Sequence, residues 1–131
     1  MEEIFATQWM QKMMEEWNNE PTLANELLNL GFNSTIAYGF DDESEPRGVL
    51  VIKKGKAVLG STFIDQECDW DLRASKEHWK EWLKNPPGMM TLGMAYTSRK
   101  LQFFKGDYTA MIKDPRMAGP FLKSFIVMGR V

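Results

Sequence analysis

The sequence predicts an α+β fold in which one mainly antiparallel sheet carries helices from both ends of the chain. Three observations indicate this. Apolar residues recur with a helical period near both ends, strand-like segments gather in the middle, and a tight turn joins two of those segments. At 131 residues the chain has the length of one domain, which can bury enough surface to fold without disulfides or metals. We therefore expect a single domain over residues 1–131.

Residues 3–18 have the pattern of an amphipathic helix. Every fourth residue from Phe5 to Trp17 is a large apolar side chain, so these residues share one face. Pro21 ends this helix, because proline fits only the first turn of the helix that follows. A second helix is expected over Thr22–Leu30.

The middle of the chain alternates short apolar segments with turns, which is typical of strands. We expect strands at Ser34–Phe40, Gly48–Lys53, Ala57–Phe63 and Cys68–Ala74. The turn around Lys54-Gly55 joins the second strand to the third. A turn this short makes the two strands an antiparallel hairpin.

Ser75 is the expected N-cap of a helix over Lys76–Lys84, whose buried face carries Trp79. The elements that follow are a short apolar helix at Met89–Tyr96, a strand at Arg99–Lys105, a helix at Tyr108–Lys113 capped by Asp107, and a last helix at Phe121–Met128. The last helix is expected to begin late because Asp114-Pro115 and Gly119-Pro120 interrupt the pattern before it.

Charge is distributed unevenly along the chain. Residues 1–48 carry ten acidic and two basic side chains, whereas residues 99–131 carry seven basic and two acidic ones. The basic, apolar end could meet an anionic headgroup, a membrane surface or nucleic acid. The alternative is that an acidic helix simply packs beside a basic one, and charge alone favours this second interpretation.

Two aspartates are the first candidates for acid–base chemistry. Asp69 and Asp71 alternate along one strand and so share a face, as paired catalytic carboxylates would. Trp70 and Leu72 occupy the opposite face. Apolar side chains inward and carboxylates in water is the ordinary pattern of a half-buried strand, and we expect that arrangement here.

The other candidates for chemistry lack partners. His78 is the only histidine and lies off the apolar face of its helix, so we expect it to be solvated. Cys68 is the only cysteine and is expected to be buried and inert. Gly55–Thr62 has the glycines of a phosphate loop, but Ser61 stands where the lysine should be. No catalytic residue, metal or cofactor is therefore expected, and the chain is not expected to be an enzyme.

Methionine is abundant, with ten residues, and many of them lie in the last third of the chain together with several phenylalanines. Methionine adapts to irregular space, which suits a cavity for variable apolar ligands, whereas tight cores are mostly leucine, isoleucine and valine. The alternative is that all these side chains fill an ordinary core. For any single residue that alternative is the better interpretation.

The stretch CDWDLRASKEHWKEWLKNPP, followed by MMTLGM and RKLQFFKGDYTAMIKDP, resembles the lipid-transfer domain of the sterol carrier protein type 2 family. The N-terminal segment WMQKMMEEWNNEPTLANELL is similar to the stand-alone bacterial branch of that family. The chain departs from the family pattern at Arg99, where Gly is usual before Lys-Leu. The resemblance implies a five-stranded sheet covered by helices on one face, with an apolar tunnel between them. It also implies binding of fatty acid, fatty acyl-CoA, phospholipid or sterol without chemistry.

The sites follow from the periods of the expected elements and from the amphiphilic ligand that the resemblance implies. The expected lining of the tunnel comprises Trp9, Met13, Trp79, Leu83, Met90, Met94, Leu101, Phe103, Met111, Phe121 and Phe125. The expected headgroup contacts at its mouth are Arg99, Lys100, Lys113 and Arg116, with Lys105 and Lys123 as further candidates.

Two functions from different classes stay open. The first is binding or transfer of a lipid or acyl-CoA, with transient contact to a membrane surface and no nucleic acid partner. The second is an accessory protein-interaction domain whose cavity is filled. The acidic N-terminus differs from a signal peptide, and no apolar run approaches 18 residues, so a cytoplasmic location is expected.

Overall fold

The computed structural model describes residues 3–131. Its elements are α1 (Thr7–Asn18), α2 (Pro21–Asn29), β1 (Ser34–Phe40), β2 (Gly48–Lys53), β3 (Lys56–Thr62), β4 (Trp70–Ala74), α3 (Lys76–Lys84), α4 (Met89–Thr97), β5 (Leu101–Lys105), α5 (Tyr108–Lys113) and α6 (Pro115–Met128). Apart from α1 and α6, each element lies within two residues of its predicted bounds.

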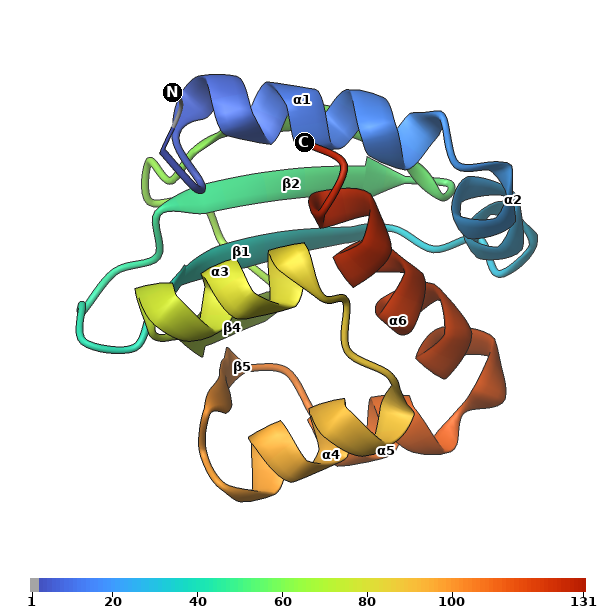
Figure 1. Cartoon of the computed structure of the whole chain (residues 1–131). Coiled ribbons are helices and arrows are strands. Elements are labelled where there is room, and N and C mark those ends of the chain that lie inside the picture. The colour runs from blue at the N-terminus through green and yellow to red at the C-terminus, as the bar shows by residue number, and fades with distance from the viewer. Residues whose placement is uncertain (1–2) are drawn as a thin grey trace.

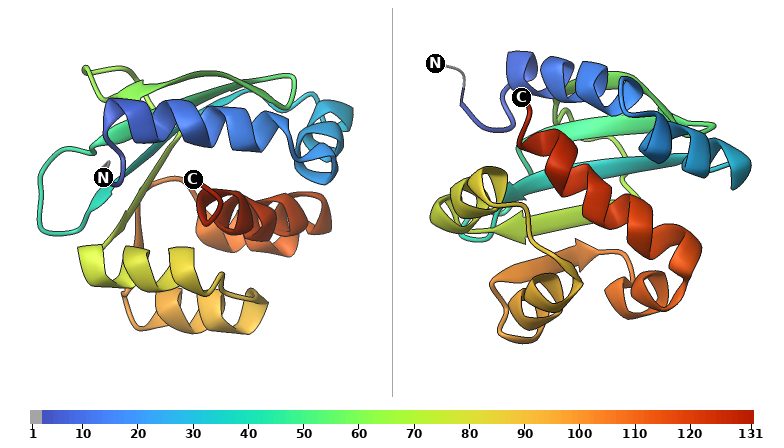
Figure 2. Two further views of the ribbon diagram at one scale, coloured as in Figure 1. Left: turned by 45° about the horizontal axis from the view of Figure 1, so that its top comes forward. Right: turned by 45° about the vertical axis from the view of Figure 1, so that its right-hand side comes forward.

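The five strands form one sheet in the order β3-β2-β1-β4-β5. The pair β1–β4 is parallel and the other three pairs are antiparallel, so the predicted α+β, mainly antiparallel architecture is confirmed. Helices α1, α3 and α6 pack against the same face of this sheet, with α6 crossing it beside the central strands (Figure 1, Figure 2). The main core lies between these helices and the sheet.

The β2–β3 hairpin is attached to the end of α1 by side-chain hydrogen bonds. The Asn18 side chain donates to the carbonyl of Ala57 at 2.8 Å and accepts from its amide at 2.9 Å. Trp17 donates from Nε1 to the carbonyl of Gly55 at 3.0 Å. Gly60 permits this close packing, because a Cβ at that position would collide with the backbone of Met10 in α1.

Helix α1 begins at Thr7, later than predicted, because Phe5 leaves the helical path. Phe5 has a φ of 69° and is buried, which places its ring against Tyr38 and Trp79. A left-handed residue cannot continue a right-handed helix. The side chain fills the core from outside the helix instead.

Helix α6 begins at Pro115 rather than at Phe121, so the predicted interruption before Phe121 is wrong. Asp114 caps the helix by accepting from the amide of Arg116 at 3.0 Å. Pro115 is the first helical residue, where an amide hydrogen would have no partner in any case. Pro120 lies inside the helix, where it removes a single backbone hydrogen bond.

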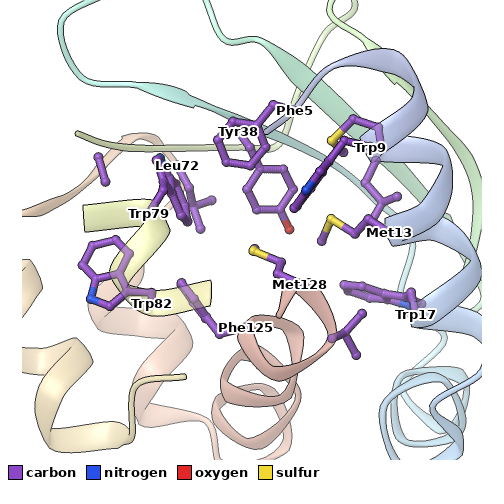
Figure 3. Close-up of a cluster of buried hydrophobic side chains, with 14 of the residues drawn as sticks. Phe5, Trp9, Met13, Trp17, Tyr38, Leu72, Trp79, Trp82, Phe125 and Met128 are labelled. Carbon is purple, nitrogen blue, oxygen red and sulfur yellow. The ribbon is translucent and has the colours of Figure 1, made fainter. Parts of the chain in front are cut away.

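Trp79 of α3 lies at the centre of the aromatic core (Figure 3). Its ring meets Phe5 edge to face at 5.1 Å and stacks on Phe125 of α6 at 6.1 Å. Its Nε1 donates to the carbonyl of Gly39 in β1 at 2.8 Å. One side chain therefore joins α3, α6 and the sheet.

The expectation that Asp71 faces water is wrong. Asp71 is buried and pairs with Arg73, whose Nε lies 2.6 Å from Oδ1 and whose Nη2 lies 3.0 Å from Oδ2. The Arg73 guanidinium also donates to the carbonyls of Phe40 and Glu43, and it lies over the ring of Phe104. These contacts cover the outer face of β4, which the alternation of the strand predicts to be solvated. Residue 69, in contrast, is exposed as expected.

The prediction that His78 is solvated is wrong. Its ring is half-buried against Trp82, one turn further along α3, with ring centroids 5.9 Å apart. Its Nδ1 is buried and has no hydrogen-bond partner among residues 3–131. Cys68 is buried as predicted, and burial raises the pKa of its thiol, which keeps it protonated.

Candidate functional site

An apolar cavity lies between the sheet and α6. Its lining comes from α1, α2, β1, β4, β5, α5, α6 and the loop before β1: Trp17, Leu27, Phe32, Ile36, Tyr38, Trp70, Leu72, Phe103, Met111, Met117, Pro120, Phe121 and Ser124. On α6 the contributors are spaced by three and four residues and so share one face. On the sheet, Tyr38 and Leu72 are direct partners in the β1–β4 register.

The cavity is small, with a volume of about 50 Å³. One water needs roughly 10–15 Å³ of such space, whereas pockets for drug-sized ligands are typically about 300 Å³ or more. A long acyl chain therefore fits only if the surrounding helices move. The structure does not show the open tunnel that the resemblance implies.

Three of the predicted lining residues, Phe103, Met111 and Phe121, are brought together at this cavity. Those that lie in the adjoining core instead are Trp9, Met13, Trp79, Leu83, Leu101 and Phe125. Met90 and Met94 of α4 do not face inward, since they are 79% and 67% exposed. Helix α4 is apolar on every side, so its period could not identify the inward face.

Sequence reasoning missed the contributions of α2, the loop before β1, β1, β4 and the start of α6. Ile36 and Tyr38 alternate along β1 on the inward face, a signal that was available in the sequence. Met117 and Pro120 were missed because the helix was predicted to begin after them.

The Tyr38 hydroxyl is an unusual polar group in this lining. Ser124 donates to the carbonyl of Phe121, and the indole of Trp17 is bonded to Gly55. The Tyr38 hydroxyl makes no hydrogen bond within the described chain, and it points toward Met13 and Met128 (Figure 3). Burial raises the pKa of this phenol far above its ordinary value of about 10.

We expect Tyr38→Phe to remove part of the loss of stability at high pH. The unfolded chain releases the Tyr38 proton near pH 10, whereas the folded protein retains it, so the free energy of unfolding falls as the pH rises above about 10. Urea unfolding of parent and variant between about pH 8 and about pH 11 measures this. Tyr96→Phe, at an exposed tyrosine, is the control. If the difference in free energy of unfolding between the parent and Tyr38→Phe stayed the same across this pH range, the expectation would be contradicted.

The predicted headgroup residues lie on the surface. Arg116 is 71% exposed and pairs with Asp114 at 3.0 Å, and these hydrogen bonds lower the pKa of the Asp114 carboxyl. Arg99, Lys100 and Lys113 are exposed and make no ion pair within the part of the chain that is described. Of the two further candidates, Lys105 is exposed and Lys123 pairs with a glutamate of α2 at 3.3 Å.

Residues 3–131 hold neither a metal-binding cluster nor a membrane-spanning helix. No three His, Cys, Asp or Glu side chains are grouped there where they could hold a metal ion. No helix in this range combines the length and the apolar character needed to cross a membrane.

This five-stranded mixed sheet with helices on one face is the fold of known sterol carrier protein 2 structures, as structural alignment shows. The crystal structure of sterol carrier protein 2 aligns with a TM-score of 0.75 and 18% identity, over 98% of this chain and 99% of that one. A second match is a solution structure from Thermus thermophilus, of a conserved hypothetical protein described as possibly a sterol carrier protein. It aligns with a TM-score of 0.70 and 18% identity, over 98% of this chain and 89% of that one.

A third structure, a UbiJ-SCP2 ubiquinone synthesis protein, aligns with a TM-score of 0.58 and 10% identity, over 93% of this chain and 88% of that one. No protein-family model matches the sequence, and neither does any curated protein. These similarities confirm the fold that the sequence resemblance implied.

Proposed function

We propose that this protein binds a lipid non-covalently between the sheet and α6 and performs no chemistry on it. The observation that carries the proposal is the apolar cavity beneath α6. Methionine and phenylalanine side chains of α5 and α6 line it, and such side chains adapt to ligands of different shape. A buried methylene contributes about 0.8 kcal/mol, so a long acyl chain has enough apolar surface for micromolar binding.

The junction of α5 and α6 is where the cavity can widen. Asp114 ends α5 and caps α6, so one extended residue is the only link between the two helices. Met111 precedes this link and Met117 follows it, and both line the cavity. Pro120 removes a backbone hydrogen bond from the same end of α6, which lowers the cost of displacing it.

We further infer that the preferred ligand carries an anionic head, as a fatty acid, an acyl-CoA or an anionic phospholipid does. Lys113 and Arg116 flank Asp114 at the junction, close in the chain to the lining residues Met111 and Met117. Exposed cations at the mouth of an apolar cavity stabilise an anionic head while the chain is buried. Arg99 and Lys100, at the end of α4, are two further exposed cations.

The alternative function is an accessory protein-interaction domain. The small volume of the cavity favours it, because about 50 Å³ is close to a filled core. The two functions differ in one observable. A lipid carrier must bind a fatty acid in solution, whereas an accessory domain with a filled cavity need not.

We expect the purified protein to bind a fluorescent fatty acid with micromolar Kd, and Met117→Trp to weaken binding about tenfold by filling the cavity. Met90→Trp adds the same bulk on the exposed surface and is the matched control.

Titrating one acyl chain as free acid, CoA ester and neutral ester, at low and high salt, tests the preference for an anionic headgroup. Absent binding, together with no lipid in extracts of the protein, would favour the accessory domain. Equal affinities across the three ligands would leave only an apolar cavity.

A further inference from the structure

Helix α4 exposes methionine on a surface without charge. None of its nine residues carries a charge at neutral pH, and Leu92 and Ala95 are buried against the rest of the protein. Met90 and Met94 are four residues apart and therefore adjacent on the outer face, where they are 79% and 67% exposed. Met89 is 42% exposed and extends this apolar surface, and a contiguous exposed apolar patch is a common feature of surfaces that contact another molecule or a membrane.

The surroundings of α4 in the chain are basic. Residues 82–106 contain no acidic residue, although the whole protein has a net charge of −2. The four basic residues in this range are Lys84, Arg99, Lys100 and Lys105. None of them makes an ion pair within residues 3–131. The acids that border the range are Glu81, which accepts from the Asn85 side chain, and Asp107, which caps α5.

Arg99 is held in a strained backbone conformation at the end of α4. Its φ is 64°, its amide donates to Tyr96, and the amide of Lys100 donates to Ala95. This pair of hydrogen bonds is the common C-terminal helix motif in which glycine usually occupies the left-handed position. An arginine there makes the turn less stable than a glycine would.

We propose that α4 docks this protein on an anionic lipid bilayer, with Met90 and Met94 among the headgroups and Arg99 and Lys100 at the phosphates. An uncharged helix with flexible apolar side chains and unpaired cations at its end matches the chemistry of a bilayer surface. The inference rests on the proposed function, because a lipid carrier must meet the membrane to load or release its ligand.

The docking surface adjoins the cavity. The Tyr96 ring of α4 meets the Phe103 ring of β5 edge to face, with ring centroids 6.0 Å apart. It also stacks on the Tyr108 ring of α5, with centroids 4.1 Å apart. Phe103 itself lines the cavity and contacts Phe121 of α6 at 6.0 Å. A lipid that leaves a bilayer beside α4 therefore has a continuous row of aromatic side chains leading to the cavity.

Co-sedimentation with vesicles of phosphatidylcholine, with and without phosphatidylserine, tests the docking. The parent should bind the vesicles that contain phosphatidylserine, and high salt should weaken this binding. The double variant Met90→Ser/Met94→Ser should bind about tenfold more weakly. Ile64→Ser is the matched control: Ile64 is 75% exposed, but it lies in a loop with Asp65 and Glu67, and this variant should bind like the parent.

Arg99→Gly should change thermal stability and vesicle binding in opposite directions. Glycine relieves the left-handed strain, so the variant should melt at a higher temperature than the parent while binding anionic vesicles more weakly. A purely structural role for Arg99 would change stability without changing vesicle binding.

Parent-like binding by the methionine double variant, or equal binding of the parent to neutral and anionic vesicles, would overturn the docking proposal. So would failure of the parent to bind either kind of vesicle, the result expected if an acidic protein covers α4. The proposed function is tested apart from this, by fatty acid binding without vesicles. There the double variant Met90→Ser/Met94→Ser should match the parent, because neither side chain lines the cavity.

Discussion

Replacing Trp79 by alanine should lower the free energy of unfolding by about 3–5 kcal/mol. The side chain is fully buried and contacts Phe5, Trp82 and Phe125, so alanine leaves a large cavity at the centre of the core. The loss is a substantial part of the roughly 5–15 kcal/mol that stabilises a domain of this size. Thermal and urea unfolding of parent and variant measure it.

Trp79→Phe separates packing from hydrogen bonding. It retains an aromatic ring but leaves the carbonyl of Gly39 without its donor, so we expect a smaller loss than for alanine. Trp70→Ala, at a half-buried indole on the edge of the core, is the comparison and should cost less stability than Trp79→Ala. Melting of Trp79→Ala at the parent temperature would mean that α3 does not pack as described.

Elements with local signals could be predicted from the sequence. The bounds of α3 and α5 agree with the prediction because each helix starts at a side chain that caps it: Ser75 accepts from His78, and Asp107 accepts from Ala110. The β2–β3 hairpin was predicted for the same reason, since Lys54 and Gly55 both adopt the left-handed conformation of a short turn. These signals are contained in a few consecutive residues.

The residues that line the cavity were harder to predict, because the lining depends on which faces of the helices and strands pack together. Met90 and Met94 match the apolar composition of a lining but lie outside, since α4 has apolar residues all round. Met117 belongs to the lining only because α6 continues through Pro120, against the usual effect of proline. Tertiary packing decides both outcomes.

The buried pair of Asp71 and Arg73 shows the same limit on the other side of the sheet. Alternation along β4 correctly separates Leu72 from the two charged residues, but it assigns the charged face to water. The end of β1 and the loop that follows it cover that face, and the Arg73 guanidinium donates to the carbonyls of Phe40, Glu43 and Ser44. Burial of a strand face by a loop from elsewhere in the chain cannot be predicted from the alternation of residues along that strand.

Arg73→Met should therefore destabilise the protein by about 3–5 kcal/mol, because it leaves the Asp71 carboxylate buried without its partner. Arg73 is 1% exposed, so water cannot replace its hydrogen bonds to the carboxylate and to the three backbone carbonyls. The matched control is Arg116→Met. That arginine makes a similar two-point pair with Asp114 on the surface, where water can replace its hydrogen bonds, so its loss should destabilise the protein far less.

The double variant Asp71→Leu/Arg73→Met distinguishes an unpaired charge from lost packing. Removing both charges should recover part of the stability lost by Arg73→Met alone, because the uncompensated carboxylate is gone and only the carbonyls of the loop lack a donor. Urea unfolding of the four proteins in this cycle gives the coupling energy between the two side chains. A loss for Arg73→Met no greater than for Arg116→Met would show that the pair is hydrated and that the loop does not close over β4.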